Sequence, residues 1–235
     1  MGNGYFKFRQ FTVWHDRCAM KVGTDGVLLG AWADAPEVHR ALDVGCGSGL
    51  IALMLAQRFP EARVTGVEID TDAAAQAASN VQASPWAERI EVTHADFCTF
   101  QSAVPYDLIV SNPPYFMDAL RPPEPGRSLA RHVATLNYET LFARSRVLLA
   151  SDGRVCVILP VEVEHQAVDA ASRSGLYPCR KLCVFTKEHK PQRRMLIAFA
   201  ASPQPILTGS LYLMNADGTY SDAYRTLTAD FYLSR

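Results

Sequence analysis

The segment Ser111–Tyr115, with the sequence SNPPY, follows the apolar run YDLIV and leaves it through two prolines. Proline has no backbone N–H and holds the residue before it in an extended conformation. We therefore expect Asn112 and Pro113 to form a stiff corner that is rich in hydrogen-bond acceptors and poor in donors. Such a corner suits a ligand group that carries N–H donors.

An amine attached to a ring is the group that this corner suits best. It has two N–H donors, and its lone pair is drawn into the ring, which makes it a poor nucleophile at neutral pH. If Asn112 Oδ1 and the Pro113 carbonyl each accept one hydrogen bond, the positive charge that grows on the nitrogen strengthens both bonds in the transition state. Tyr115 is predicted to stack on the ring and Phe116 to form a second wall. The alternative is that the tetrad NPPY, residues 112–115, is only a rigid strand exit.

A glycine-rich loop lies in LDVGCGSG, at the end of another apolar run. Gly45, Gly47 and Gly49 allow a tight turn and the close approach of a ligand, but their spacing is GxGxG rather than the GxGxxG of dinucleotide binders. With Asp43 before it, the loop resembles the S-adenosylmethionine loop of class I methyltransferases. The resemblance implies that Asp43 organises the loop and the cationic end of the cofactor, and that the glycines make room for it. The alternative is an ordinary glycine-rich turn.

Two acidic residues follow later apolar runs. Glu68, in VEID, is predicted to accept hydrogen bonds from both ribose hydroxyls of the cofactor, as acidic residues do in nucleotide-binding folds. The methyltransferase pattern implies that Asp96, in HADF, accepts from the adenine amino group of the cofactor and that Phe97 contacts the adenine ring. An aspartate after a strand is also a common helix cap, so that interpretation of Asp96 stays open.

The segment KVGTDGVLLGAWA precedes the glycine-rich loop. Thr24 or Asp25 is expected to cap a short helix that begins near Gly26, and the N-terminus of that helix favours a carboxylate such as that of the cofactor's methionine end. The sequence does not decide which of the two residues touches the cofactor. A cap without a ligand is the other interpretation.

The elements that position these residues alternate between strands and helices. Apolar runs at 41–45, 63–69, 89–94, 106–112 and 154–160 are separated by helical patterns, and the runs RKLCVFT and RRMLIAFA flank KEHKPQ without a helix between them. The pattern predicts an α/β fold of the Rossmann-like, class I methyltransferase type: a doubly wound, mostly parallel seven-stranded sheet with an antiparallel edge hairpin. Ligands of such sheets bind at the carboxyl ends of the strands.

Composition limits the remaining choices. The chain has 235 residues and a net charge of −1, which excludes a globally basic nucleic-acid binder. Its six cysteines are scattered, so neither a metal site nor a disulfide framework is expected. We expect a single domain over 1–235, with an N-terminal segment 1–36 that carries the cofactor-capping helix, a core 37–201 and a C-terminal tail 202–235. Because neither a signal peptide nor a membrane-spanning run is visible, a cytoplasmic location is expected.

The combination of motifs is more specific than any one of them. FRQFTVWHDRCAMKVGTDGVLLGAW, LDVGCGSG, VEID, SNPPY and the tail YRTLTADFYL together resemble the bacterial adenine N6-methyltransferases that modify the base beside the anticodon of a valine tRNA. The resemblance covers nearly the whole chain. It implies S-adenosyl-L-methionine as cofactor, S-adenosyl-L-homocysteine as product, and tRNA as partner.

Two alternatives share the same tetrad or loop. Release-factor glutamine methyltransferases also act on a group with two N–H donors, but they carry a helical domain ahead of the core. A non-catalytic RNA module that binds the cofactor would leave the tetrad idle. Basic residues in two stretches favour an RNA substrate, and a solvated face is the alternative for each stretch. These residues are Arg127 and Arg131 after the tetrad, and Lys187, Lys190, Arg193 and Arg194 in KEHKPQRR.

Overall fold

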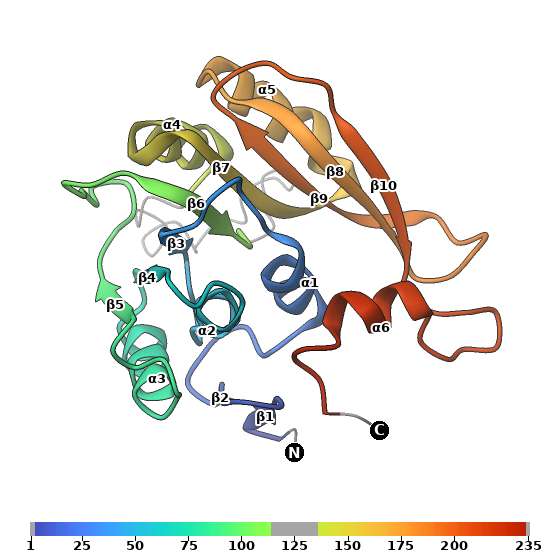
Figure 1. Ribbon diagram of the computed structural model, residues 1–235, viewed down its shortest axis with the longest axis horizontal. Coiled ribbons are helices and arrows are strands. Elements are labelled where there is room, and N and C mark those ends of the chain that lie inside the picture. Colours follow the sequence, from blue (N-terminus) through green and yellow to red (C-terminus); the bar gives the residue numbers. More distant parts are fainter. Residues whose placement is uncertain (1–2, 114–135, 234–235) are drawn as a thin grey trace, which may run out of the picture.

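The computed structural model describes residues 3–113 and 136–233, which form a mixed sheet with helices on both faces (Figure 1). In the described residues this sheet has eight strands, in the order β10-β8-β9-β7-β6-β3-β4-β5. The strands of the sheet are β3 (Arg40–Val44), β4 (Arg63–Glu68), β5 (Ile90–His94), β6 (Tyr106–Ser111), β7 (Leu149–Pro160), β8 (Tyr177–Phe185), β9 (Gln192–Ala200) and β10 (Leu207–Tyr212). Strand β9 is antiparallel to β7 and β8, and the other neighbouring pairs are parallel. The fold class expected from the sequence is confirmed.

The helices follow the strands in the order expected of βα units. They are α1 (Thr24–Trp32), α2 (Leu50–Arg58), α3 (Thr71–Gln82), α4 (Tyr138–Leu148), the short 3₁₀ helix Val161–Val163, α5 (Glu164–Arg173) and α6 (Asp222–Thr228). A separate two-stranded hairpin, β1 (Tyr5–Lys7) and β2 (Thr12–Trp14), precedes α1. None of the helices in the described ranges is long and apolar enough to cross a membrane.

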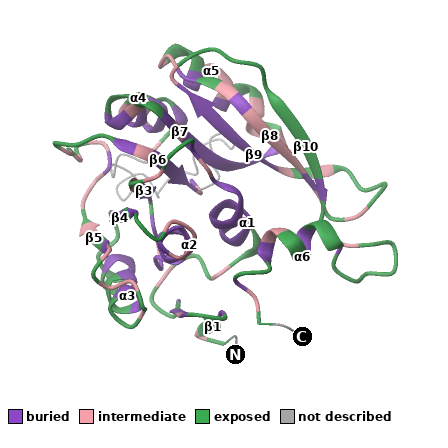
Figure 2. Cartoon of the chain, viewed as in Figure 1, coloured by how far each residue is buried: buried purple, intermediate pink, exposed green. Residues whose placement is uncertain are grey.

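Alternation along the central strands divides the core into two clusters. Leu108 and Val110 of β6 belong to one cluster and Ile109 to the other, because successive side chains of a strand point to opposite faces. The first cluster includes α1, α2 and α6, and the second includes α4 and α5. These strands are buried on both faces (Figure 2), as a parallel sheet covered by two helical layers requires.

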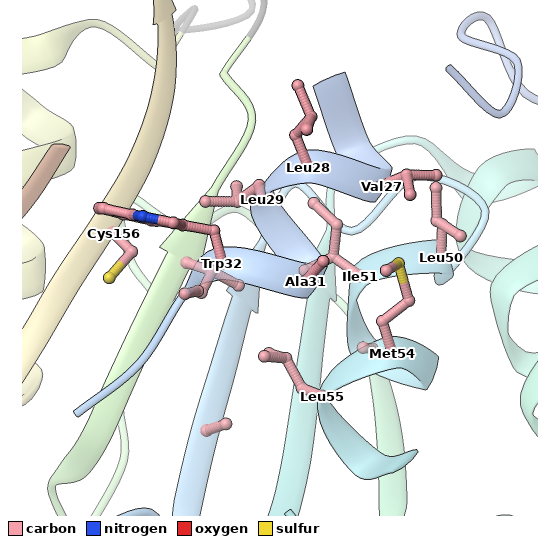
Figure 3. Packing of buried hydrophobic residues seen from close by; sticks show 14 of the residues in the cluster. Val27, Leu28, Leu29, Ala31, Trp32, Leu50, Ile51, Met54, Leu55 and Cys156 are labelled. Atoms are coloured by element: carbon pink, nitrogen blue, oxygen red, sulfur yellow. The ribbon is translucent and has the colours of Figure 1, made fainter. Parts of the chain in front are cut away.

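Helices α1 and α2 pack closely on the first face of the sheet (Figure 3). Leu28 and Leu29 of α1 and Met54 of α2 are almost completely buried. The approach depends on Gly30, because an added Cβ there would lie 2.7 Å from Met54 Sδ. This packing holds the first turn of α1 at the same edge of the sheet as the glycine-rich loop that precedes α2.

Some sequence expectations about the elements are wrong. The sheet has an eighth strand, so the edge strand is β10 rather than the β8–β9 hairpin. Strand β10 escaped prediction because only Leu211 in it is buried, which leaves no alternating apolar pattern. Helix α3 is capped by Asp70, whose Oδ1 accepts from Ala73 N at 2.9 Å. The segment 202–235 therefore contributes a strand and a helix to the fold, and we propose that the described elements form one domain.

Candidate active site

The carboxyl ends of β3, β4 and β6 meet at one point of the sheet edge. Val44 is in register with Val67 of β4 on one side and with Ser111 of β6 on the other. The buried Ser111 Oγ also donates a hydrogen bond to the Val44 carbonyl at 2.9 Å. Strand order reverses between β3 and β6, and ligands of doubly wound sheets bind at such a switch point. The glycine-rich loop thus leaves the sheet beside the half-buried Asn112 and the buried Pro113.

The glycine-rich loop forms an open cradle at this point. Gly45 N and Cys46 N donate to the Val67 carbonyl at 2.8 and 3.1 Å, which fixes the start of the loop on β4. Gly45 and Gly47 have φ values of +69° and +54°, and a Cβ added to either would meet no atom within 4 Å. Gly49 differs, because a Cβ there would lie 3.3 Å from Ala77 Cβ of α3. Gly45 and Gly47 face open space, whereas Gly49 allows α3 to approach the loop.

Glu68 fastens the far side of the cradle. Its Oε2 accepts from Gly47 N at 2.8 Å, and its Oε1 accepts from Ile69 N and Asp70 N at 2.9 Å each. A carboxylate offers about four acceptor positions, so one remains for a hydroxyl of a ligand. The sequence predicted only the ribose contact, and the three backbone hydrogen bonds give Glu68 a further role in holding the loop.

Asp43 places a fully buried carboxyl group behind the cradle. Its Oδ2 accepts from Ala52 N of α2 at 3.0 Å, and its Oδ1 has no hydrogen-bond partner among the described residues. Burial raises the pKa of Asp43 to about 7, and the nearby charge of Glu68 acts in the same direction. A buried carboxyl with an unused oxygen is well suited to a cationic ligand. The open glycines, this carboxyl and Glu68 together fit S-adenosylmethionine, the cofactor expected from the sequence.

Asp96 and Phe97 follow β5 at the same edge of the sheet. Asp96 Oδ1 accepts from Cys98 N at 2.8 Å within a turn, so the expected alternative of a helix cap is wrong. Phe97 is 5% exposed and packs in the core with Val44 and Val67. Their contacts with the adenine of the cofactor stay predictions.

The first turn of α1 differs from the expected arrangement. The helix begins at Thr24 with the extended Gly23 at the N-cap position, and no side chain makes a cap hydrogen bond. Neither Thr24 nor Asp25 is therefore the cap, and the helix begins two residues before Gly26. Asp25 Oδ2 instead accepts a hydrogen bond from Arg194 Nε of β9 at 2.9 Å. Because this ion pair binds α1 to β9, Arg194 acts in the framework of the site, and its expected RNA contact stays a prediction.

The remaining predicted RNA contacts lie in two regions. Lys187 is half-buried in the loop between β8 and β9, whereas Lys190 and Arg193 are exposed. The loop and the start of β9, which carries Arg193, lie at the carboxyl end of β8, the same edge of the sheet as the cradle. Four other predicted site residues lie outside the described residues: Tyr115, Phe116, Arg127 and Arg131.

Sequence reasoning missed two polar residues on the buried side of α3. Gln76 and Asn80 are 5% and 2% exposed. Asn80 Nδ2 donates to the carbonyls of Ser48, in the glycine-rich loop, and of Trp14, at 2.9 and 2.8 Å. The signal was available, because the two residues are four apart and share one helix face with Ala73 and Ala77.

No group of three or more histidine, cysteine, aspartate or glutamate side chains within 3–113 and 136–233 is arranged to hold a metal ion. All six cysteines are free thiols.

Comparison with known proteins agrees with this geometry. Residues 22–171 match the family model for the methyltransferase small domain. Two curated relatives are named tRNA1(Val) (adenine(37)-N6)-methyltransferase: one from Bacteroides thetaiotaomicron is 49% identical over 99% of each chain, and one from Aeromonas hydrophila is 46% identical over 98% of each chain. The chain therefore belongs to the methyltransferase small domain family and, within it, to the family of these two relatives.

A solved structure of a predicted O-methyltransferase from Agrobacterium tumefaciens has a similar fold. It aligns with a TM-score of 0.71 over 90% of this chain and 99% of its own, at 19% identity. At that identity the likeness shows the class I methyltransferase fold alone. The family resemblance that the sequence motifs indicated is confirmed by the relatives.

Proposed function

We propose that this chain transfers a methyl group from S-adenosylmethionine to N6 of adenine 37 in tRNA1(Val), leaving S-adenosylhomocysteine. The observation that carries the proposal is the adjacency of two parts of the site. The open cradle follows β3, and the acceptor corner Asn112–Pro113 follows its neighbour β6. The relatives that are similar over their whole length carry that activity in their names.

The cradle residues would hold the cofactor in three ways. S-adenosylmethionine, when bound, supplies a methyl group made electrophilic by a sulfonium. Asp43 provides a buried anionic group for the cationic methionine end, Gly45 and Gly47 leave the space that the ligand fills, and Glu68 accepts from the ribose. The loop that carries them is fixed to β4 by hydrogen bonds from Gly45 N and Cys46 N to the Val67 carbonyl and from Gly47 N to Glu68 Oε2.

The corner residues would act on the adenine amine. Asn112 Oδ1 and the Pro113 carbonyl accept its two N–H groups and hold the nitrogen with its lone pair toward the methyl group. As the N–C bond forms, positive charge grows on the nitrogen and both hydrogen bonds strengthen, so the transition state gains more than the ground state. The nitrogen then loses one proton to water, and no strong general base is required.

An anticodon loop suits this arrangement because its bases are unpaired and can be splayed into a pocket. Stacking of adenine 37 on Tyr115 is part of the proposal, as are phosphate contacts of Lys190 and Arg193, which are exposed at the same sheet edge. An anticodon-loop substrate also implies a cytoplasmic location for the protein.

The test is methyl transfer from labelled S-adenosylmethionine to a tRNA1(Val) transcript, followed by mapping of the modified nucleoside. We expect N6-methyladenine at position 37 and no transfer to a matched transcript with guanine there. Transfer to a glutamine of a release factor in place of tRNA would contradict the proposal. Binding of cofactor and tRNA without transfer would instead support a non-catalytic module.

A further inference from the structure

The hairpin β1–β2 presents one face to solvent. Tyr5 is in register with Trp14, and Lys7 with Thr12, so these four side chains share a face. The opposite face carries Val13, which is fully buried. Tyr5 and Trp14 are 39% and 50% exposed, although their rings lie only 4.9 Å apart. All three residues of β1 and Trp14 of β2 are exposed, so the aromatic pair is available to a partner.

The charge around this pair is positive. Residues 3–23 contain four basic side chains, Lys7, Arg9, Arg17 and Lys21, and a single acidic one, Asp16, in a chain whose net charge is −1. Lys7, Arg17 and Lys21 are exposed. Asp16 Oδ1 accepts a hydrogen bond from Gln76 Nε2, so the one acid is already engaged by α3. The outward face of the hairpin is thus aromatic, and residues 15–21, which follow it and are called the strip below, are basic.

Helix α3 fixes this strip against the cofactor cradle. Trp14 N donates to Asn80 Oδ1 at 3.0 Å, and the same amide group donates to the Ser48 carbonyl of the glycine-rich loop. One helical turn earlier, Gln76 Oε1 accepts from Arg17 N at 2.9 Å.

The strip follows α3 as far as Cys18. Cys18 Sγ donates a hydrogen bond to Gln76 Oε1 at 3.3 Å, and α3 begins just after the Glu68 carboxylate that fastens the cradle. Four residues span at most about 14 Å, so Trp14 lies within that distance of Cys18. The strip is therefore held by the same helix that holds the glycine-rich loop, and the strand before that loop pairs with β6, which ends beside Asn112.

We infer that the outward face of the hairpin, with Tyr5, Lys7 and Trp14, and the adjoining Arg17 form a docking surface for the anticodon arm of the substrate tRNA. An unpaired base stacks on the Tyr5–Trp14 pair, and the basic side chains contact phosphates. Aromatic platforms flanked by basic residues bind single-stranded nucleic acid in this way. The inference rests on the proposed function and extends it, because it names a surface outside the site of methyl transfer.

The experiment measures binding of a fluorescent anticodon stem–loop of tRNA1(Val) to Trp14→Ala, Trp14→Phe and Lys7→Ala by anisotropy. We expect Trp14→Ala to weaken binding about tenfold, because the free energy of base–aromatic stacking corresponds to a change in affinity of that order. Trp14→Phe keeps an aromatic ring and should retain most of the wild-type affinity. Lys7→Ala should lower the slope of log K against log salt by about 0.7 to 0.9. The matched control is Tyr177→Ala. Tyr177 is 36% exposed and lies at the start of β8, at the edge of the sheet opposite the cradle, so this variant should bind the stem–loop like the wild type.

Cofactor binding, measured by calorimetry, should be unchanged in every variant. An unchanged cofactor affinity shows that the variant is folded. Unchanged stem–loop affinity in a folded Trp14→Ala protein would overturn the inference. If that variant also shifts from dimer to monomer in sedimentation, the face is a contact between two copies of the chain and the inference is overturned in the same way. If Trp14→Ala does not fold, Lys7→Glu decides, because Lys7 is exposed: it should abolish the binding, and wild-type affinity would overturn the inference. A wild-type protein that does not methylate adenine 37 would overturn the proposed function instead.

Discussion

Replacing Asp43 with asparagine should stabilise the cofactor-free protein above neutral pH and weaken its binding of S-adenosylmethionine. The reason is that Asp43 is fully buried with one carboxyl oxygen that has no hydrogen-bond partner among the described residues. Asparagine keeps the carbonyl that accepts from Ala52 N and cannot ionise. It therefore imitates the protonated acid, which the cofactor-free fold prefers.

The magnitude follows from the pKa of Asp43, which burial raises from 3.8 to about 7. At a pH between these two pKa values, Asp43 is protonated in the folded protein and ionised in the unfolded chain, so the folded state becomes less stable as pH rises. At about 1.4 kcal/mol per pH unit the total reaches roughly 4 kcal/mol near pH 7 and stays constant above it. Asp43→Asn does not lose stability in this way. The difference between its free energy of unfolding and that of the wild type should be near zero at pH 4 and reach up to roughly 4 kcal/mol at pH 8.

Urea unfolding without cofactor, from pH 4 to pH 8, measures the difference in the free energy of unfolding. The control is Glu61→Gln, which removes one negative charge from an exposed side chain. Calorimetric titration at pH 8 should show S-adenosylmethionine binding at least about tenfold weaker in Asp43→Asn, because the cationic ligand loses its buried anionic partner. A variant that is less stable than the wild type at pH 8, or that binds the cofactor with wild-type affinity, would refute the reasoning.

Three further changes test the cradle and the RNA contacts. Gly47→Val should abolish cofactor binding in calorimetry, because the side chain enters the open space, whereas Gly218→Val imposes the same left-handed strain outside the site and should leave binding unchanged. Glu68→Ala should lose cofactor binding and also destabilise the protein to urea by about 2 kcal/mol or more, because three backbone N–H groups lose their acceptor. Replacing Lys190 and Arg193 together with alanine should weaken tRNA binding and lower its salt slope by about 0.7 to 0.9 per lost phosphate contact, with cofactor affinity unchanged.

Much of the site was predictable because it lies where strands end. Gly45, Gly47 and Glu68 follow apolar runs at fixed places in a βα pattern, and parallel strands bring such ends to one edge. The adjacency of the SNPPY corner and the cradle could not be read from the runs themselves. It depends on the reversal of strand order between β3 and β6, which is a tertiary property.

The missed features are those in which tertiary contacts override local pattern. Strand β10 has one buried residue and joins the sheet through its pairing with β8. Arg194 appears in the sequence as part of a basic stretch, but in the fold its partner is Asp25, which is distant along the chain. The link from Asn80 to the glycine-rich loop required knowledge of which face α3 buries.

The central claim is that Asn112 accepts a hydrogen bond from the adenine amine as charge develops on it. Single-turnover methylation of tRNA1(Val) by Asn112→Ala, with saturating tRNA and cofactor, tests this claim most directly. Loss of one preorganised partner of a developing charge costs about 3 kcal/mol, so the rate should fall on the order of a hundredfold while both affinities stay within a few-fold of wild type. A folded Asn112→Ala protein that binds both ligands and transfers methyl groups at the wild-type rate would contradict the mechanism and leave the SNPPY corner as scaffold.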